Sequence, residues 1–208
     1  FYATVLNNIG RVLYLLENYD EALEAYQNAL NIRREKLGAS SIDLSATICN
    51  TGQTLHQLGK FDGALKLYEE FLALIKKQGP EEQRDVAIIL RCVADIHHRK
   101  EDYESARDVY VKALEETKLS VGGLHPEVAS TLNKLGSVCF EMKDCVAALE
   151  YYTQSLEQEH MFLGKLHPQT LVTLLNIAHI YHQVGNFTDA YKRFKEVHAS
   201  MVIMYGTD

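Results

Sequence analysis

Long hydrophobic runs are missing from this chain of 208 residues. No apolar stretch reaches the roughly 18 to 20 residues that a membrane-spanning helix needs. The chain also begins with Phe1 and Tyr2, without a Met or a signal-peptide pattern. We therefore expect a soluble protein with no membrane partner, and we expect the chain to be a piece of a longer protein.

Closely spaced cysteine pairs are missing as well. The four cysteines, Cys49, Cys92, Cys139 and Cys145, show neither CxxC spacing nor the density of a disulfide scaffold. This usage predicts reduced thiols and a cytoplasmic location. Cys49 and Cys92 are candidates for reactive thiols, but no base stands beside either in the sequence. The commoner role of a small hydrophobic residue is therefore favoured.

An excess of positive charge is also absent, because the formal net charge is −7. Nucleic-acid binding draws its affinity from clustered Lys and Arg, so the charge argues against a nucleic-acid partner. Alternation of apolar and polar residues is nowhere sustained, whereas apolar residues at helical spacing fill most of the chain. With 47% hydrophobic and 24% charged residues, the sequence predicts a single folded, all-α domain.

What the chain does contain is a repeat of 42 residues. A small residue recurs at this step as Gly10, Gly52, Ala94, Gly136 and Ala178, and an alanine as Ala22, Ala64, Ala106, Ala148 and Ala190. An aromatic ring recurs as Tyr26, Tyr68, Tyr110, Tyr152 and Phe194. A register kept through five copies without an insertion predicts a repeat architecture.

Each repeat is predicted to form two helices. The expected helices cover residues 2–16, 20–37, 41–58, 62–78, 82–100, 103–120, 126–142, 145–163, 168–184 and 187–204. Within a repeat the two helices are expected to cross closely at Gly10 and Ala22, which leaves a socket for the ring of Tyr26.

The breaks between helices carry capping residues in phase with the repeat. Asn18, Asp102, Asp144 and Asn186 can accept hydrogen bonds from the free N–H groups of a helix start. Gly38, Gly122, Gly164 and Gly206 mark helix ends, where glycine adopts the left-handed conformation. The pairs His125-Pro126 and His167-Pro168 then place a histidine beside a helix start.

These small, alanine and aromatic positions resemble the tetratricopeptide repeat, whose usual unit has about 34 residues. The longer unit here, with LNN at Leu6 to Asn8 and LG-x-x-HP at Leu163 to Pro168, resembles the repeats of kinesin light chains. The first two inter-repeat loops lack the HP pair. The resemblance implies a right-handed α-solenoid of five antiparallel helix pairs, the TPR superhelix, as a single array over residues 1–208. Its repeats are expected at about 1–40, 41–82, 83–124, 125–166 and 167–208.

The resemblance also implies a concave groove, lined by the first helix of each repeat, that binds a peptide or helix of a partner protein. The candidate groove residues are Asn7, Asn8, Arg11, Asn50, Gln53, Arg91, Asp95, Asn133, Lys134, Asn176 and His179. Asn8, Asn50 and Asn176 share one phase, and an amide can clamp the backbone of an extended peptide. The alternative is that these amides bond the backbones of their own or neighbouring helices. The carboxylate clamp of chaperone-binding relatives does not match these positions.

Other readings of the same face are weaker. His56, His98 and His182 share a phase, but first helices lie about 10 Å apart and a zinc ligand must approach to about 2 Å. We therefore expect solvated histidines and no metal site. His179 and His182 stand three residues apart on one helix, but no Cys or carboxylate lies beside them, so the expectation of no metal site is kept. No nucleophile with a base or phosphate loop is present, so we expect neither catalytic residues nor a cofactor. A remaining alternative is a structural segment of a larger protein that self-associates through uncapped ends.

Overall fold

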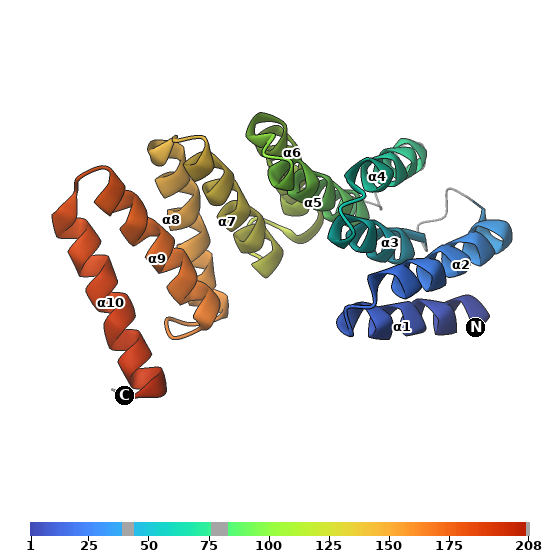
Figure 1. Cartoon of the computed structure of the whole chain (residues 1–208). Coiled ribbons are helices and arrows are strands. Elements are labelled where there is room, and N and C mark those ends of the chain that lie inside the picture. The colour runs from blue at the N-terminus through green and yellow to red at the C-terminus, as the bar shows by residue number, and fades with distance from the viewer. Residues whose placement is uncertain (39–43, 76–82, 207–208) are drawn as a thin grey trace. The chain divides into compact units, whose positions relative to one another are not determined.

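The computed structural model describes residues 1–38, 44–75 and 83–206, and within these ranges every regular element is a helix (Figure 1). The elements are α1 (Tyr2–Leu15), α2 (Tyr19–Leu37), α3 (Ser45–Gln57), α4 (Phe61–Ile75), α5 (Gln83–Arg99), α6 (Tyr103–Val121), α7 (Pro126–Glu141), α8 (Cys145–Phe162), α9 (Pro168–Gln183) and α10 (Phe187–Tyr205). The all-α prediction and the pairing of the helices are confirmed. The expected start of the third helix at residue 41, end of the fourth at 78 and start of the fifth at 82 lie outside the described residues.

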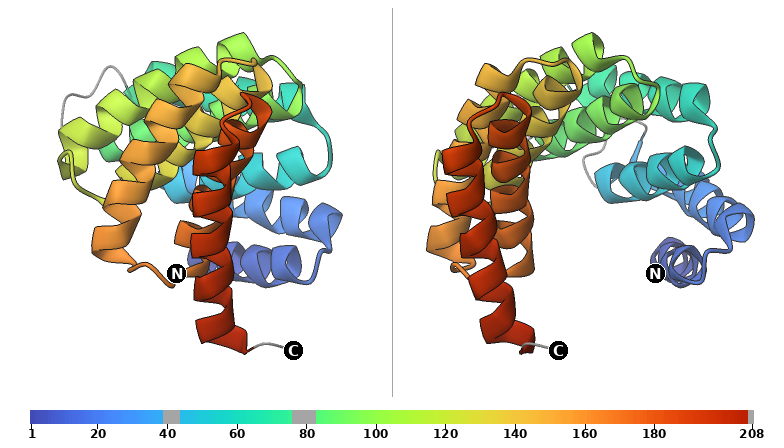
Figure 2. Two further views of the ribbon diagram at one scale, coloured as in Figure 1. Left: turned by 90° about the vertical axis from the view of Figure 1, so that its left-hand side faces the viewer. Right: turned by 60° about the vertical axis from the view of Figure 1, so that its left-hand side comes forward.

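The chain is an all-α solenoid of five helix pairs and divides into two compact units. Unit 1 is Phe1–Lys100 and unit 2 is Glu101–Asp208. In unit 1, the pairs α1/α2 and α3/α4 pack in succession, and α5 packs on α3 and α4. In unit 2, α6 packs on α7, and the pairs α7/α8 and α9/α10 follow. Figure 2 shows α9 and α10 lying antiparallel. That all five repeats act as a single domain stays a prediction.

In the first, second and fourth hairpins, a tyrosine ring packs into a socket of small residues. Ala22 is fully buried, and a Cβ atom placed on Gly10 would lie 2.8 Å from the Tyr26 ring. The same contact recurs in unit 2, where a Cβ atom on Gly136 would lie 2.9 Å from the ring of Tyr152. Burying such a ring removes roughly 150 to 250 Å² from water, which contributes about 4 to 6 kcal/mol. The predicted socket is therefore confirmed, and it explains the small residues at these phases.

Side-chain caps begin several of the helices. Asp102 accepts a hydrogen bond from the Ser105 N–H at 3.3 Å, and Asp144 accepts one from Ala147 N–H at 3.0 Å. Asn186 accepts from the Asp189 N–H at 3.3 Å. Asn18 occupies the same position before α2 but makes no such bond. Three of the four predicted caps are confirmed, and each stabilises its helix by about 1 kcal/mol.

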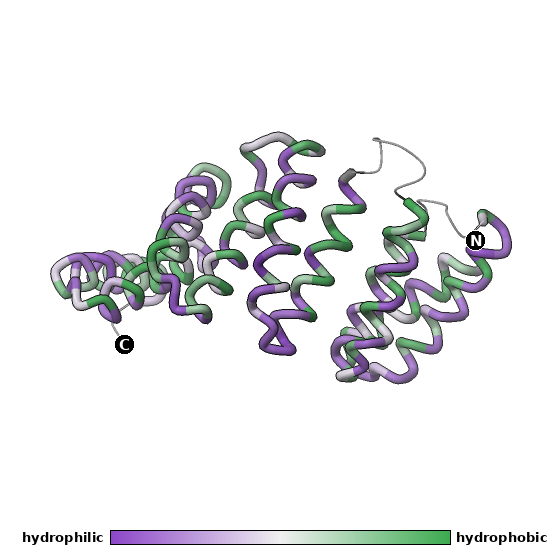
Figure 3. Tube along the Cα trace, turned by 90° about the horizontal axis from the view of Figure 1, so that it is seen from above, coloured by the Kyte–Doolittle hydropathy of each residue, from purple (hydrophilic) through white to green (hydrophobic). Residues whose placement is uncertain are grey.

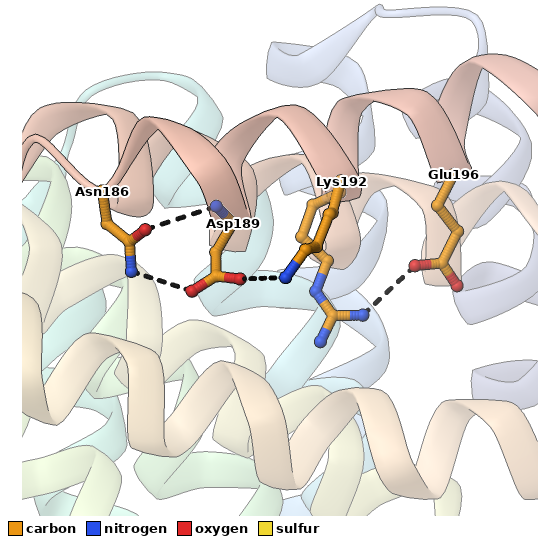
Figure 4. A network of polar contacts seen from close by, with 5 residues as sticks. Asn186, Asp189, Lys192 and Glu196 are labelled. Carbon is orange, nitrogen blue, oxygen red and sulfur yellow. Dashed lines mark hydrogen bonds and ion pairs between the residues drawn. The ribbon is translucent and has the colours of Figure 1, made fainter.

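The cap of α10 extends into a short polar network, drawn in Figure 4. The Asn186 amide donates to Asp189 at 2.9 Å, and Lys192 pairs with the same carboxylate at 3.1 Å. Arg193 pairs with Glu196 one turn further on, also at 3.1 Å. These exposed pairs stabilise the last helix only modestly, because water screens them.

The two histidines of the HP pairs are caps themselves. His125 Nδ1 accepts from the Glu127 N–H, and His167 Nδ1 accepts from the Gln169 N–H, both at 3.2 Å. Each proline that follows stands in the first helical turn, where its missing N–H is not needed. The sequence placed both rings beside helix starts, and the structure adds that they close those starts.

The turn inside each hairpin has one left-handed residue that the sequence did not reveal. Glu17, Glu101 and Lys143 have φ angles of 62°, 61° and 66°, and glycines occupy the same phase in the second and fifth repeats. Side chains other than glycine are strained in this region. The turn geometry is therefore set by the packing of the two helices, which fixes the backbone whatever the residue.

Hydrophobic and hydrophilic residues share each helix (Figure 3), as expected for helices that bury one stripe. Along the described ranges, no helix is both long and apolar enough to cross a membrane.

Candidate functional site

The candidate groove residues lie on the first helices of the repeats, and they form one face in each unit. We call α1, α3 and α5 the first-helix face of unit 1, and α7 and α9 the first-helix face of unit 2. Neighbouring first helices contact each other in unit 1, where α1 packs on α3 and α3 on α5. Side chains one repeat apart on these helices are therefore close enough to contact each other.

Two hydrogen bonds cross between α1 and α3 in unit 1. The Asn50 amide donates to the Asn7 side-chain oxygen at 3.3 Å, and the Gln57 amide donates to the Tyr14 hydroxyl at 3.1 Å. Both bonds join residues 43 positions apart, which is one repeat plus one residue. Asn7 and Asn50 are half-buried. Asn50 thus bonds a neighbouring helix, as in the alternative reading, but through a side chain and not through the backbone.

Cys49 and Cys92 occupy the next pair of the same phase, between α3 and α5. The Cys49 thiol donates to Cys92, and this bond raises the pKa of Cys49, as does its burial. The same bond lowers the pKa of Cys92, with help from the Tyr68 hydroxyl and from the Gln53 amide, whose nitrogen lies 3.9 Å from the sulfur. Cys92 is buried. The two thiols thus behave as a linked pair rather than as independent small hydrophobic residues.

The remaining predicted residues of unit 1 differ in exposure. Asn8, Arg11 and Gln53 are exposed, whereas Arg91 and Asp95 are half-buried. The exposed three offer amide groups and one positive charge to an incoming chain. The half-buried Asp95 lies near Tyr68 and Cys92, where its charge disfavours ionisation of both groups. Burial is the main cause that raises the pKa of Tyr68, whereas the pKa of Cys92 stays lowered because the hydrogen bond from Cys49 outweighs the effect of Asp95.

In unit 2, the predicted amides also contact neighbouring helices. The Asn133 amide donates to the Thr173 hydroxyl, which joins α7 to α9. Asn176 bonds to the hydroxyl of Tyr152. Burial raises the pKa of that hydroxyl to about 12, while the bonds to Ser137 and Asn176 lower it. The Asn133 bond thus joins α7 to α9, and the Asn176 bond joins α9 to α8.

The charged and imidazole groups of unit 2 lie against rings. The Lys134 ammonium is 5.9 Å from the centroid of the Tyr110 ring, a cation–π distance. His179 is exposed, and its ring lies 5.3 Å from that of Phe194. His179 is thus the most accessible of the predicted residues in unit 2, because Asn133, Lys134 and Asn176 are half-buried.

The rings at the repeat position of His56 and His182 pack against the first aromatic ring of the following helix. Tyr14 and Tyr19 lie 5.3 Å apart between ring centroids, and His56 and Phe61, like His182 and Phe187, lie 5.5 Å apart. Each pair connects the end of a first helix to the start of a second. The expectation of solvated histidines is wrong for His56 and His98, which are half-buried. It holds for the exposed His182.

Within the part of the chain that the structure describes, no three His, Cys, Asp or Glu side chains lie close enough together to hold a metal ion.

Comparison with protein families gives one match that spans the repeats. The tetratricopeptide repeat family matches residues 1–77, 85–158 and 142–201. Comparison with curated protein sequences gives no match.

Solved structures resemble the chain over nearly its whole length. BtubC (BKLC) from P. vanneervenii has a TM-score of 0.85 at 22% identity, covering 98% of this chain and 81% of that one. A putative kinesin light chain of Podosopora anserina with nearly identical TPR-like repeats has a TM-score of 0.82 at 16% identity, covering 98% and 97%. A MamA protein has a TM-score of 0.66 at 18% identity, covering 100% and 97%. At these identities the likeness concerns the fold.

Proposed function

The chain belongs to the tetratricopeptide repeat family, and on that premise we propose that it is a protein-interaction scaffold without catalytic activity. Its ligand is a peptide or helical segment of a partner protein, bound on the first-helix faces. The four free thiols suit a reducing compartment such as the cytoplasm.

The observation that carries the proposal is a set of exposed polar side chains on the first helices, supported by half-buried ones that are already bonded. Asn8, Arg11 and Gln53 in unit 1, and His179 in unit 2, are exposed. Behind them, the Asn50–Asn7 and Asn133–Thr173 bonds hold neighbouring first helices in place. Rigid support beneath accessible donors and acceptors favours binding, because less side-chain freedom is lost on association. We therefore assign direct contact to the exposed residues and support to the bonded amides.

Selection of a displayed random-peptide library on the whole chain tests this function. A selected peptide is titrated into labelled protein, and the amide shifts are mapped by NMR. We expect the shifts to fall on α1, α3 and α5 or on α7 and α9. The double variant Asn8→Ala, Arg11→Ala should weaken a peptide bound to unit 1 by more than about tenfold, because such anchors carry most of the binding energy.

The control is a double variant on second helices, Glu24→Ala with Lys112→Ala. Both side chains are exposed, and their replacement by alanine removes comparable polar groups from α2 and α6. This variant should bind as the wild type does. Shifts centred on the second helices, or equal binding by both double variants with unchanged melting, would count against the proposal.

A second candidate function is self-association of the array through its ends, and an exposed apolar stripe on α1 favours it. Tyr2, Val5, Ile9 and Val12 lie on one side of this helix and are 38% to 64% exposed. The residues in the same phases of α7 are Val128, Thr131, Leu135 and Val138, and all four are fully buried where α6 covers them. The stripe thus occupies the position of an inter-repeat surface, and no described residue of this chain covers it.

The occupant that we propose for this stripe is α10 of a second copy. On α10, Phe187, Tyr191 and Met201 are exposed. Met201 shares its phase with Thr117 and Glu159, which are buried against the following repeat. The two ends therefore carry complementary halves of one type of interface, and contact between them is head-to-tail and open-ended.

Light scattering over a range of protein concentrations tests the self-association. We expect the mean mass of the wild type to rise with concentration and the variant Val12→Lys to stay monomeric, because a charge would be buried in the contact. Val146→Lys is the control, since Val146 is 80% exposed on α8 and lies on neither end helix. A constant wild-type mass, or the same behaviour in both variants, would argue against this candidate.

A further inference from the structure

A cavity lies at the base of the fourth hairpin in unit 2, and none of the candidate groove residues lines it. The starts of α7 and α9 and the end of α8 enclose about 280 Å³. Apolar walls come from Ala129, Phe162 and Leu163, and polar groups come from Glu159 and Gln169 among others. We call this space the base cavity. It is many times the roughly 30 Å³ that one water molecule occupies in the liquid, so it can hold a small organic group.

The same cavity recurs in the first hairpin, in unit 1, with about 350 Å³. Its lining residues Ala3, Thr4, Arg33, Lys36 and Leu37 stand three repeats before Ala129, Ser130, Glu159, Phe162 and Leu163 of the base cavity. A cavity at this place is therefore a property of the hairpin geometry. The side chains that line it set its charge, which is basic in the first repeat and acidic in the fourth.

Glu159 is the acidic group of the base cavity, and half of its carboxylate lacks a hydrogen bond. The side chain is only 2% exposed. Its Oε1 atom lies 3.2 Å from the Ser155 hydroxyl, which is closer to the Ala129 carbonyl at 2.8 Å. Its Oε2 atom has no hydrogen-bond partner. Burial raises the pKa of this carboxyl, while the side chains of Thr173, Ser155 and Gln169 lower it. A buried carboxylate left in this condition favours a ligand that donates hydrogen bonds.

Positive charge is missing from the cavity lining. The lining residues include neither Lys nor Arg. His167 Nδ1 accepts a hydrogen bond from the Gln169 N–H, so this nitrogen offers no proton to a ligand. Glu159 is thus the one carboxylate of the lining, and no Lys or Arg of the lining neutralises it.

We propose that the base cavity binds a primary alkylammonium group, with Glu159 as its counter-ion and Phe162 and Leu163 around its aliphatic stem. An ammonium is a compact charge with three donors and needs only one free carboxylate oxygen. A guanidinium binds best when both carboxylate oxygens can be approached, and here the Ser155 hydroxyl oxygen occupies the space 3.2 Å from Oε1. The geometry of the donors thus favours an amine over a guanidinium. A free alkylamine and a lysine side chain of a partner protein present the same chemistry.

The test is an NMR titration of the whole chain with n-butylammonium chloride, against sodium chloride at equal ionic strength and against n-butanol. We expect saturable shifts at Ser130, Phe162 and Gln169 with the ammonium and no saturation with the alcohol. Glu159→Gln keeps the size of the side chain and removes its charge, and it should weaken binding by more than about tenfold. Glu157→Gln removes an exposed carboxylate from the same helix and should bind as the wild type does.

A second variant keeps the test decisive if Glu159→Gln alters the fold. Ser130 is exposed at the cavity, so Ser130→Phe should block entry while Glu159 is retained. Loss of saturable binding in both variants, with Glu157→Gln unchanged, supports the site. Equal binding by the Glu159→Gln variant and the wild type, or equal saturation by butanol, overturns it.

Two further ligands distinguish the sources. A short peptide with one lysine is compared with the same peptide carrying acetyl-lysine, and both are competed against butylammonium. Tighter binding of the lysine peptide, lost on acetylation, assigns the cavity to a partner's side chain. Binding of butylammonium alone assigns it to a free amine. Failure of both the peptide and the amine to bind overturns the proposal.

Discussion

Replacing Gly52 by alanine should destabilise the second hairpin by about 2 to 3 kcal/mol, the upper part of the range for overpacking a core. A Cβ atom at this position would lie 2.6 Å from Cε1 of Tyr68, and closer still to its Cζ and hydroxyl oxygen. The ring cannot swing away freely, because Tyr68 is 1% exposed and its hydroxyl donates to the Cys49 carbonyl at 3.4 Å. The added methyl group must therefore separate α3 from α4.

Native-state hydrogen exchange is the suitable measurement, because the stability of a repeat array varies along the chain. Amides of α3 and α4 in the Gly52→Ala variant should exchange faster than in the wild type, while those of α9 and α10 should keep their rates. Gly10→Ala should have a smaller effect, since its nearest ring atoms would lie at 2.8 Å.

Gly63→Ala is the matched control for the glycine substitution. Gly63 is exposed in α4, and the nearest atoms to an added Cβ are the Leu55 methyl carbons at 4.0 Å. This variant should stabilise the helix by about 0.5 to 1 kcal/mol, because alanine loses less backbone freedom than glycine on folding. If both glycine variants behaved alike, the close approach of Tyr68 to α3 would not be the cause.

The repeat register predicted the fold well because packing acts on the same phases in every copy. Gly10 and Tyr26 are in contact for the same steric reason as Gly136 and Tyr152, so one hairpin explains the others. Helix starts were predictable where a short polar side chain or proline occurs. The left-handed turn residue was not, since Glu17 and Lys143 give no local signal for that conformation.

For the candidate site, the sequence predicted which helix face each residue lies on, but not the contacts that its side chain makes. Phase determines which residues lie on a first helix, but it does not determine what each side chain bonds. Asn50 bonds to Asn7, whereas the residues of the same phases in the next interface are Cys92 and Cys49. In both pairs the two residues are 43 positions apart, and this spacing of one repeat plus one residue is the signal in the sequence that would have indicated them. Exposure separated contact residues from support residues, and exposure depends on the packing of whole helices.

Glu159 was missed because it looked like one more acid on a helix that is rich in them. The signal lay in its position within the repeat, because the other four repeats have no acidic residue at this position. They carry Arg33, Ile75, Thr117 and Met201. Apart from the first and last repeats, these residues are fully buried. An acid in a buried phase marks a site where folding must accommodate a charge.

Replacing Glu159 by glutamine should therefore stabilise unit 2 at neutral and alkaline pH, in the absence of any amine. Burial raises the pKa of this carboxyl above its value in the unfolded chain, which is about 4.3. The folded state thus disfavours the charged form. The resulting contribution to stability is fully present below about pH 4.3 and is lost as the pH rises through the folded-state pKa. At about pH 8 the glutamine variant should be more stable by about 1.4 kcal/mol for each unit by which the folded-state pKa of Glu159 exceeds the unfolded one, because the amide carries no charge to bury.

The comparison that isolates this effect is the difference between wild type and variant, because other carboxylates titrate over the same range. Asp189, for example, has its pKa lowered by Lys192 and Asn186, so its contribution grows as the pH rises. Exchange rates of the α8 amides are measured from about pH 4 to 8, after correction for the intrinsic pH dependence of exchange. The wild type should lose protection relative to Glu159→Gln as the pH rises, and Glu157→Gln should follow the wild type. A difference that is constant with pH would show that Glu159 is charged equally easily in the folded and unfolded chain.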